Sequence, residues 1–435
     1  MTMRRALSVL VVLLFPVLAS AEGKRLTIDD VVHGALASHP RLTAVRARAE
    51  AARDLAKSAG GRLLPAIVVT DEYQHWDDVF APAFPIAGPV PAPSIQVRDQ
   101  NTNTFVAAAS QPIVGLLRRS EDYKAEARAA EAADRGVAAA ESATREALET
   151  EYLRMFEAVA LQEIARVSEA ELGEQVAVTA AEVKAGTLTQ ADLLRVKVAQ
   201  ANARQQGIAA KTQVILSQAN LLSAVGLDPN DATIEFVEPA SLLEAAEAPA
   251  PRASSELAMA RRPEVAQATL TAEAARHQAR ARAYALLPEV DLEGAYMRVD
   301  GQVFAPKNSG FVGVKASWPI WEWGASANAR NAAALQAQAA NADVETERRR
   351  VQVEVTSRAA QLDAAASAVD VAKEAIASAE EAYRVTQVSV RAGAATVTDL
   401  LDSQAALTGA RLNATRARYQ RAMAKVALDR ATGAH

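Results

Sequence analysis

The chain has 435 residues, with 47 basic and 52 acidic side chains, a net charge of −5 and no cysteine. The lack of cysteine excludes disulfides and thiol chemistry, and the mild acidity, without a basic patch interleaved with aromatics, argues against nucleic acid as a partner. The five histidines show no metal-type spacing, and no phosphate-binding loop or nucleophile motif occurs. We therefore expect no enzyme activity, no cofactor and no bound metal.

Residues 1–21 have the features of a secretory signal peptide. Arg4 and Arg5 precede an apolar run over 6–18, and small residues then form a cleavage site that ends at Ala21. The run is too short for a membrane helix, and no later run approaches the roughly 20 apolar residues that one needs. We expect an exported chain that, if it enters a membrane, does so as a closed β-barrel.

The rest of the sequence contains an internal repeat with two copies. The paired segments are RLLPAIVV and ALLPEVDL, SQPIVGLL and SWPIWEWG, and AGTLTQADLL and AGAATVTDLL. Such a duplication usually means two copies of one supersecondary unit. We expect a first repeat over 22–227, a Pro- and Glu-rich linker over 228–253, and a second repeat over 254–435.

Two long tracts without proline are predicted to be helical. Residues 113–228 and 320–435 are rich in Ala, Leu, Glu, Gln and Arg, which are strong helix formers. Each tract is broken once, at Gly186 and at Gly393, and the threonines that follow each glycine suit the cap of a second helix. Each tract therefore reads as a helical hairpin with its turn at the glycine. The first arm, of about 70 residues, would be roughly 105 Å long.

Apolar residues recur in both tracts in alternating steps of four and three, the period of a left-handed coiled coil. The predicted seam of the second tract comprises Val351, Val355, Leu362, Ala365, Val369, Ala372, Ile376, Ala379, Tyr383 and Val390. That of the first comprises Leu194, Val198, Ala201, Ile208, Ile215, Ala219 and Leu222. Alanine on and off the seam suggests that each helix packs on both sides. An ordinary long coiled coil would show the same period.

Segments with a period of two precede each hairpin and end at Pro112 and Pro319. They are about ten residues long, with acidic groups on one face and apolar groups on the other, as in a transmembrane β-strand between a wet lumen and lipid. The aromatic residues expected near the strand ends are Tyr73, Trp76, Phe105, Tyr296, Trp318, Trp321 and Trp323. A Pro-rich loop over 77–100 and a short one over 300–309 would join the strands. A small soluble hairpin is the alternative.

Together these patterns predict a mainly α fold with a small transmembrane β part. Each repeat reads helix, strand, strand and long helical hairpin, so one chain supplies four strands. Four strands cannot close a membrane barrel, and the interior of an eight-stranded barrel is filled by side chains. Three chains would supply twelve strands around a water-filled lumen. The arrangement favours a homotrimer with a 12-stranded β-barrel continued by a 12-helix α-barrel.

With these elements in place, the chain resembles the TolC-like outer-membrane efflux family over roughly residues 26–433. ALASHPRL resembles the family's opening helix, SQPIVGLLRRS and SWPIWEWGASANAR its strand-to-helix junctions, and the segment from RAGAATVTDLL onward its last hairpin arm. The resemblance implies a homotrimeric channel in outer-membrane lipid with its helices in the periplasm. It also implies a periplasmic adaptor (membrane fusion) protein and an inner-membrane efflux pump or type I secretion transporter as partners, with passive exit through the channel.

The resemblance further implies a periplasmic aperture at the hairpin tips, lined by aspartates. By motif these are Asp192 in TQADLL, and Asp399 and Asp402 in TDLLD. In a trimer they would form carboxylate rings that attract cations. The Thr-x-x-Asp spacing equally predicts that Asp192 and Asp399 cap their helices, whereas Asp402 lies one turn beyond the cap.

This sequence departs from the family at the residues that help to hold the mouth closed. The family member that names the group has a Tyr three residues before the hairpin glycine and an Arg two residues after it. Here these positions hold Val390 and Ala395, and Arg391 is the nearest substitute.

A soluble periplasmic coiled-coil adaptor or tethering protein is the alternative function. An adaptor should show compact β domains around one hairpin, whereas this chain repeats its hairpin together with paired strands. The sequence gives no indication of the substrate, which in such channels ranges from drugs and metals to secreted polypeptides.

Overall fold

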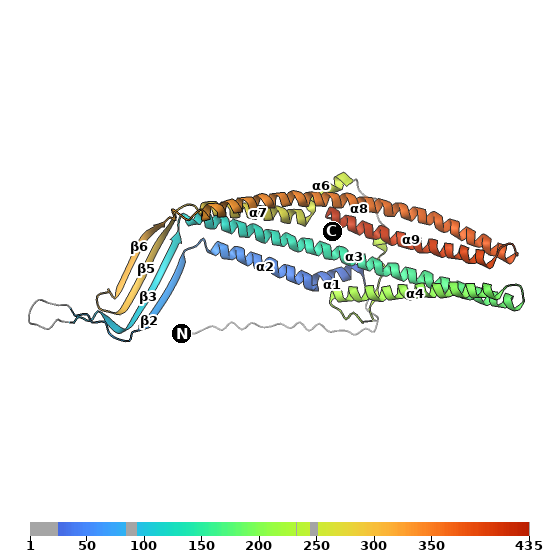
Figure 1. Cartoon of the computed structure of the whole chain (residues 1–435), viewed down its shortest axis with the longest axis horizontal. Helices are drawn as coiled ribbons and strands as arrows, with labels where there is room; N and C mark the ends of the chain where they lie inside the picture. Colours follow the sequence, from blue (N-terminus) through green and yellow to red (C-terminus); the bar gives the residue numbers. More distant parts are fainter. Residues whose placement is uncertain (1–24, 84–93, 232, 244–250, 435) are drawn as a thin grey trace, which may run out of the picture.

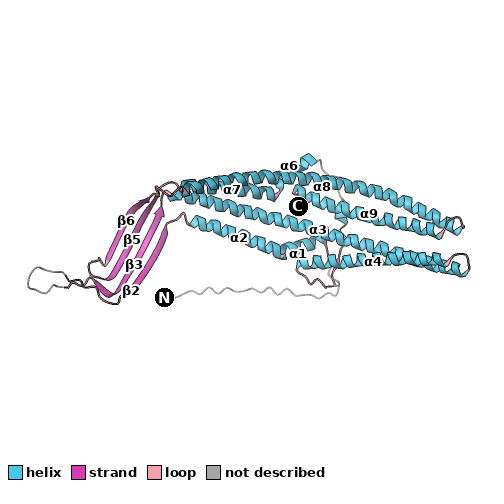
Figure 2. Ribbon diagram, in the orientation of Figure 1, coloured by secondary structure: helices cyan, strands magenta, loops and turns pink. Residues whose placement is uncertain are grey.

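The structure is a computed structural model whose described residues are 25–83, 94–231, 233–243 and 251–434. The predicted signal peptide lies outside the described residues, as do parts of the predicted linker and of the Pro-rich loop. The molecule is elongated, with a β-sheet at one end and two helical-hairpin tips at the other (Figure 1). Helices make up most of it (Figure 2), as predicted.

The elements follow the chain in this order: β1 (Arg25–Leu26), α1 (Ile28–Ser38), α2 (Pro40–Gly61), β2 (Ala66–His75), β3 (Arg98–Pro112), α3 (Gly115–Lys184), α4 (Gln190–Val225), β4 (Glu235–Phe236), α5 (Ala240–Leu243), α6 (Pro251–Arg261), α7 (Pro263–Tyr284), β5 (Glu289–Gln302), β6 (Asn308–Ser317), α8 (Ala325–Arg391) and α9 (Val397–Thr432).

The two long helices α3 and α8 run from the sheet to the tips, and the shorter α4 and α9 return only half-way (Figure 1). Both return helices end at a glycine in the left-handed region, Gly226 with φ 80° and Gly433 with φ 71°, a conformation that glycine adopts without steric cost. Beyond these ends, α2 packs on α3, and α7 packs on both α3 and α8. Helices therefore lie side by side along the whole length.

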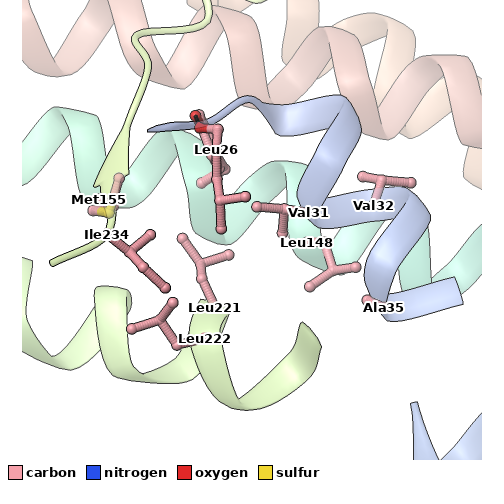
Figure 3. Packing of buried hydrophobic residues seen from close by; sticks show 10 residues of the cluster. Leu26, Val31, Val32, Ala35, Leu148, Met155, Leu221, Leu222 and Ile234 are labelled. Atoms are coloured by element: carbon pink, nitrogen blue, oxygen red, sulfur yellow. Dashed lines mark hydrogen bonds between the residues drawn. The ribbon is translucent and has the colours of Figure 1, made fainter. Parts of the chain in front are cut away.

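An apolar core closes the middle of the molecule, where α1 and the end of α4 meet α3 (Figure 3). Its members are Leu26, Val31, Val32, Ala35, Leu148, Tyr152, Met155, Leu221, Leu222 and Ile234. The Tyr152 hydroxyl is fully buried and lies 3.1 Å from the carbonyl of Leu26 and 2.6 Å from that of Val237. It thereby joins α3 to the short β1–β4 pair.

A second anchor is a network of charges at the C-terminal end of α9. The Arg262 side chain is only 1% exposed and donates to Glu354 at 2.6 Å and to Glu264 at 3.0 Å. Arg430 of α9 pairs with Glu146 of α3 at 3.1 Å. A buried arginine is tolerated when its donors are matched in this way, so the network fixes α9 against α3, α7 and α8.

The sheet has the order β2-β3-β5-β6, and every neighbouring pair is antiparallel. β2 and β6 have the predicted length of about ten residues, whereas β3 and β5 are longer. The second loop is consequently shorter than the predicted 300–309, because β5 continues to Gln302 and β6 begins at Asn308. Phe105 and Tyr296 lie within their strands, so the prediction that they lie near strand ends was wrong.

The predicted coiled-coil seams agree with the packing on α8, but on α4 only at its C-terminal end, where Leu222 is buried. On α8, Val351, Val355 and Leu362 are buried. On α4, Leu194, Val198, Ile208 and Ile215 are all more than half exposed, while Leu193, Val196 and Leu221 are buried instead. Because α4 is rich in alanine it carries two apolar faces, and α3 covers the other one. Of the predicted first-tract seam, Leu222 is buried in the core as expected, whereas the apolar residues from Leu194 to Ile215 are uncovered within a single chain.

Candidate functional site

The candidate site begins with the two hairpin tips, which lie side by side at one end of the molecule (Figure 1). The chain leaves α3 and α8 through Gly186 and Gly393, whose φ values are 80° and 72°. In each turn the residue after the glycine donates its N–H back to the preceding helix, Thr187 to Glu182 and Ala394 to Ser389. This arrangement satisfies carbonyls at the helix ends.

Asp192 and Asp399 both take part in capping boxes. Their carboxylates accept from the hydroxyl and the backbone N–H of Thr189 and Thr396, at 2.6–3.1 Å, and each threonine hydroxyl accepts from the aspartate N–H in return. The side-chain hydrogen bond from the threonine is the largest cause that lowers the pKa of each aspartate. Both carboxylates are therefore held in the charged form and stabilise the helix starts.

Asp402 and Arg391 differ from these two aspartates. Asp402 lies on the next turn of α9, is exposed, and makes no hydrogen bond or ion pair with the described part of the chain. Arg391 is the last residue of α8 and is also exposed. The start of α9 thus carries Asp402, a carboxylate without a partner in the described chain, one turn beyond the capping Asp399.

The sequence did not indicate the contact that joins the two tips. Arg195 lies one turn after the cap of α4, 3.6 Å from Asp192, and its guanidinium donates to the Thr398 hydroxyl at 2.9 Å. The two partners are separated by 203 residues in the chain. A bond across that separation leaves no local pattern, so only the fold reveals it.

The strand-to-helix junctions form the other end of the helical part. Pro112 is buried as the last residue of β3, and a Cβ on Gly115 would lie 3.0 Å from its ring, which favours glycine at the start of α3. Pro319 is exposed and lies between β6 and α8. That second junction passes through Trp323, the one non-glycine residue of the described chain with a positive φ, at 53°. Its backbone is strained while its side chain is 87% exposed.

The register of the sheet gives it two unlike faces. The cross-strand rows Ile67–Ala109–Gly294–Val312 and Val69–Ala107–Tyr296–Gly310 form one face, which is apolar next to the junctions. On the other face, the rows nearest the junctions contain Ser110, Asp291, Glu293 and Lys315. The next row, Val68–Ala108–Ala295–Phe311, is apolar, and Thr70, Glu72 and Thr104 lie farther along. Next to the junctions, the strands therefore alternate as a strand between lipid and water does.

The described residues offer neither a metal site nor a membrane-spanning helix. No cluster of three or more His, Cys, Asp or Glu side chains that could bind a metal ion is found there. None of the helices in the described chain combines the length and the apolar character needed to cross a bilayer.

Comparison with known proteins gives a family and several related folds. The family model described as "Outer membrane efflux protein" matches residues 31–227 and again 255–434. The structure of CusC, whose description refers to transmembrane channel formation, has a TM-score of 0.81 at 16% identity, covering 93% of this chain and 92% of that one. A membrane protein from Pseudomonas aeruginosa scores 0.81 at 19% identity, covering 93% of each chain.

A third structure, VceC from Vibrio cholerae, scores 0.79 at 17% identity and covers 93% of this chain and 96% of that one. No curated protein sequence matches. The TM-scores show that these proteins share the fold of this chain, although the sequence identities are low. The family model matches most of the chain in two stretches. The chain belongs to the outer membrane efflux protein family.

Proposed function

We propose that this member of the family is one subunit of a homotrimeric outer-membrane channel through which substrates leave the cell passively. The observation that carries the proposal is the sheet, whose edge strands β2 and β6 are unpaired and run antiparallel to each other. β6 of one copy can therefore continue the antiparallel order with β2 of the next. Four strands from each of three copies would give a twelve-stranded closed barrel without free edges.

The helices support closure along the same two edges. α2 and α4 flank α3 on the side of β2, and α8 lies on the side of β6 (Figure 1). Both sides expose apolar residues in the single chain: Leu194, Val198, Ile208 and Ile215 on α4, and Val353, Val371, Val385 and Val388 on α8. Copies that meet at the sheet would bring these surfaces together into an α-barrel of long helices.

The proposal assigns the two faces of the sheet to lipid and lumen. The apolar face would contact outer-membrane lipid, with Trp318, Trp321 and Trp323 at its junction end, where aromatic side chains suit the membrane interface. The face with Glu72, Asp291 and Glu293 would line the water-filled lumen. The helices would then extend into the periplasm, with Pro112 and Pro319 at the transition between the two parts.

The hairpin tips would form the periplasmic aperture, with turns at Gly186 and Gly393. Asp192, Asp399 and Asp402 would contribute negative charge in threefold rings, and Arg391 a positive group beside them. The exposed and unpaired Asp402 would contribute most to the attraction of cations, since the other two carboxylates are occupied as caps.

We further propose that the two family matches reflect a duplicated unit, with repeats over 22–227 and 254–435 joined by a linker over 228–253. A periplasmic adaptor and an inner-membrane efflux pump or type I secretion transporter would supply the energy and select the substrate. The alternative of a soluble adaptor is not favoured, because the chain pairs two helical hairpins with one continuous sheet.

The experiment is purification in detergent, mass measurement and recording in planar bilayers. The proposal expects a particle of three chains and discrete openings that prefer cations. A lipid-free monomer from the soluble periplasmic fraction, with no conductance, would overturn it.

A further inference from the structure

The two return helices begin alike but differ at their first residue. α4 and α9 each start after a threonine in a capping box with an aspartate three residues later. The first helical residue is Gln190 in α4 and Val397 in α9. Gln190 is exposed, whereas Val397 is only 4% exposed. Both helices have the same capping requirement, so the difference has to come from what surrounds Val397.

Val397 inserts into the neighbouring hairpin. It belongs to a buried cluster with Leu172 of α3 and with Val196 and Ala203 of α4, and Val176 and Leu188 pack against this cluster. Every one of these partners lies in the first hairpin. The tip of the second hairpin is therefore held by an apolar side chain that fits between the two arms of the first.

Polar contacts continue along the same side of α9. Thr398 accepts from Arg195, Gln404 donates to Glu171 at 3.4 Å, and the hydroxyls of Ser168 and Thr408 lie 3.4 Å apart. α3 and α4 pack against α9 rather than against α8, whose Val385 and Val388 near the tip remain about half exposed. The second hairpin is thus attached to the first through α9, with Val397 as its outermost contact.

We propose that Val397, seated between α3 and α4, is the latch that keeps the two hairpins of each subunit together and so sets how often the aperture opens. This inference rests on the proposed channel function. It assigns the closing contact to an apolar side chain supported by Arg195 and Thr398, in a chain that has Val390 and Ala395 where a polar latch would need Tyr and Arg. Releasing α9 from α3 would move the ring of Asp399 and Asp402 outward.

The test exchanges the two first residues. Val397→Gln gives α9 the start that α4 already has, and its capping box remains intact. The open probability in planar bilayers should rise on the order of tenfold, because burial of a valine side chain shifts a two-state equilibrium by about that factor or more. The matched control, Gln190→Val, places a valine at the same helix position on the exposed side and should leave the open probability unchanged.

A disulfide makes the test independent of how well the variant is tolerated. The chain has no cysteine, so Ser168→Cys with Thr408→Cys introduces a single pair at positions whose hydroxyls are already close. Oxidation should hold α9 on α3 and return the Val397→Gln channel to the wild-type open probability, and reduction should release it. In the double-cysteine protein that keeps Val397, oxidation should lower the open probability further.

The outcomes separate the two proposals. If the wild-type protein forms no trimer and no conducting channel, the channel function itself fails. If the wild type conducts and Val397→Gln opens no more often than Gln190→Val, or stays open with the disulfide formed, the latch is overturned and the channel function stands.

Discussion

Two aspartates three residues apart have different roles at the tip of α9. Asp399 accepts hydrogen bonds from Thr396 and caps the helix, while Asp402 is exposed and unpaired in the described chain. Removing the charge of Asp402 therefore tests ion selectivity alone, whereas a change at Asp399 also weakens a helix cap.

Asp402→Asn should reduce the preference for cations without altering the thermal stability of the assembly, because the amide keeps the shape and only the charge is lost. The reversal potential in a salt gradient measures the preference. Asp399→Asn should lower both quantities. An unchanged reversal potential for Asp402→Asn would show that this residue does not face the ion path.

The lowered pKa of Asp192 and Asp399 adds a pH dependence to this prediction. A folded-state pKa below the ordinary aspartate value means that the capping contribution is present above that value and is lost as the pH falls through the lowered one. In the Asp402→Asn channel, the remaining cation preference should therefore persist at pH values at which an ordinary aspartate is already protonated. A loss of selectivity at higher pH would contradict the capped arrangement.

Tyr152 shows how a single buried hydroxyl joins distant segments. Its ring is fully buried, and burial is the main cause that raises its pKa to about 12. Tyr152→Phe leaves the Leu26 and Val237 carbonyls without this donor and should destabilise the folded chain by about 1–2 kcal/mol. A lower urea midpoint would measure the loss. Tyr123→Phe is the control, since that exposed hydroxyl forms no hydrogen bond in the described chain.

At the scale of single elements, the helix starts and turns could be predicted and the packing face of α4 could not. Capping boxes and left-handed glycines depend on residues within one turn. The cap at Thr189 and the turn at Gly393 can therefore be recognised in the sequence. α4 carries two apolar stripes, and the predicted one, with Leu194 and Val198, turned out to be exposed. The residues of α4 themselves do not show which of the two stripes is covered by other helices of the same chain.

The exposed stripe of α4 gives a prediction about assembly. Ile208→Glu places a charge where the side chain is 53% exposed in the single chain, so the subunit should fold normally but fail to form trimers. Native mass measurement in detergent and circular dichroism check the two parts. Leu221→Ala is the contrasting variant, because it opens a cavity in the core and should destabilise the subunit itself by about 2–5 kcal/mol. A trimeric Ile208→Glu protein would show that this stripe is not an interface.

At the scale of the whole molecule, all four tryptophans lie at the sheet end, as Trp76, Trp318, Trp321 and Trp323. Indole fluorescence therefore reports on that end alone. Trp76 is held at the far end of the sheet by the Arg98 guanidinium, 3.6 Å from its ring, and the other three are mostly exposed beside the helices.

In vesicles with brominated lipids, the wild-type fluorescence should be strongly quenched. Ser in place of both Trp321 and Trp323 should remove a large part of the quenchable signal and weaken retention in the membrane, since interfacial indoles contact lipid. Trp76→Phe is the control, because it removes an indole that packs against Arg98 of the same chain. Equal quenching of the wild type and the double variant would contradict a lipid-facing junction.

The overall arrangement could be predicted because duplicated landmarks constrain it strongly. The order of strands and long helices follows from the two proline-free tracts and the period-two segments, and the structure has this order. The contacts between hairpins could not be predicted, since Val397 and Leu172, or Arg195 and Thr398, lie more than 200 residues apart in the sequence. Likewise, Arg262 gave no sign of its burial, because the acids that neutralise it come from two different helices.

The two long helices α3 and α8 have nearly equal lengths, 70 and 67 residues, and together they set the length of the helical part of the molecule. An insertion in one of these helices would put its neighbours out of step unless they lengthened as well. A matched insertion of seven residues, about 10 Å, keeps the same stripes in contact, whereas other increments rotate them away. The length of the helical part should therefore vary among relatives in steps of seven residues, so it cannot be adjusted by smaller amounts.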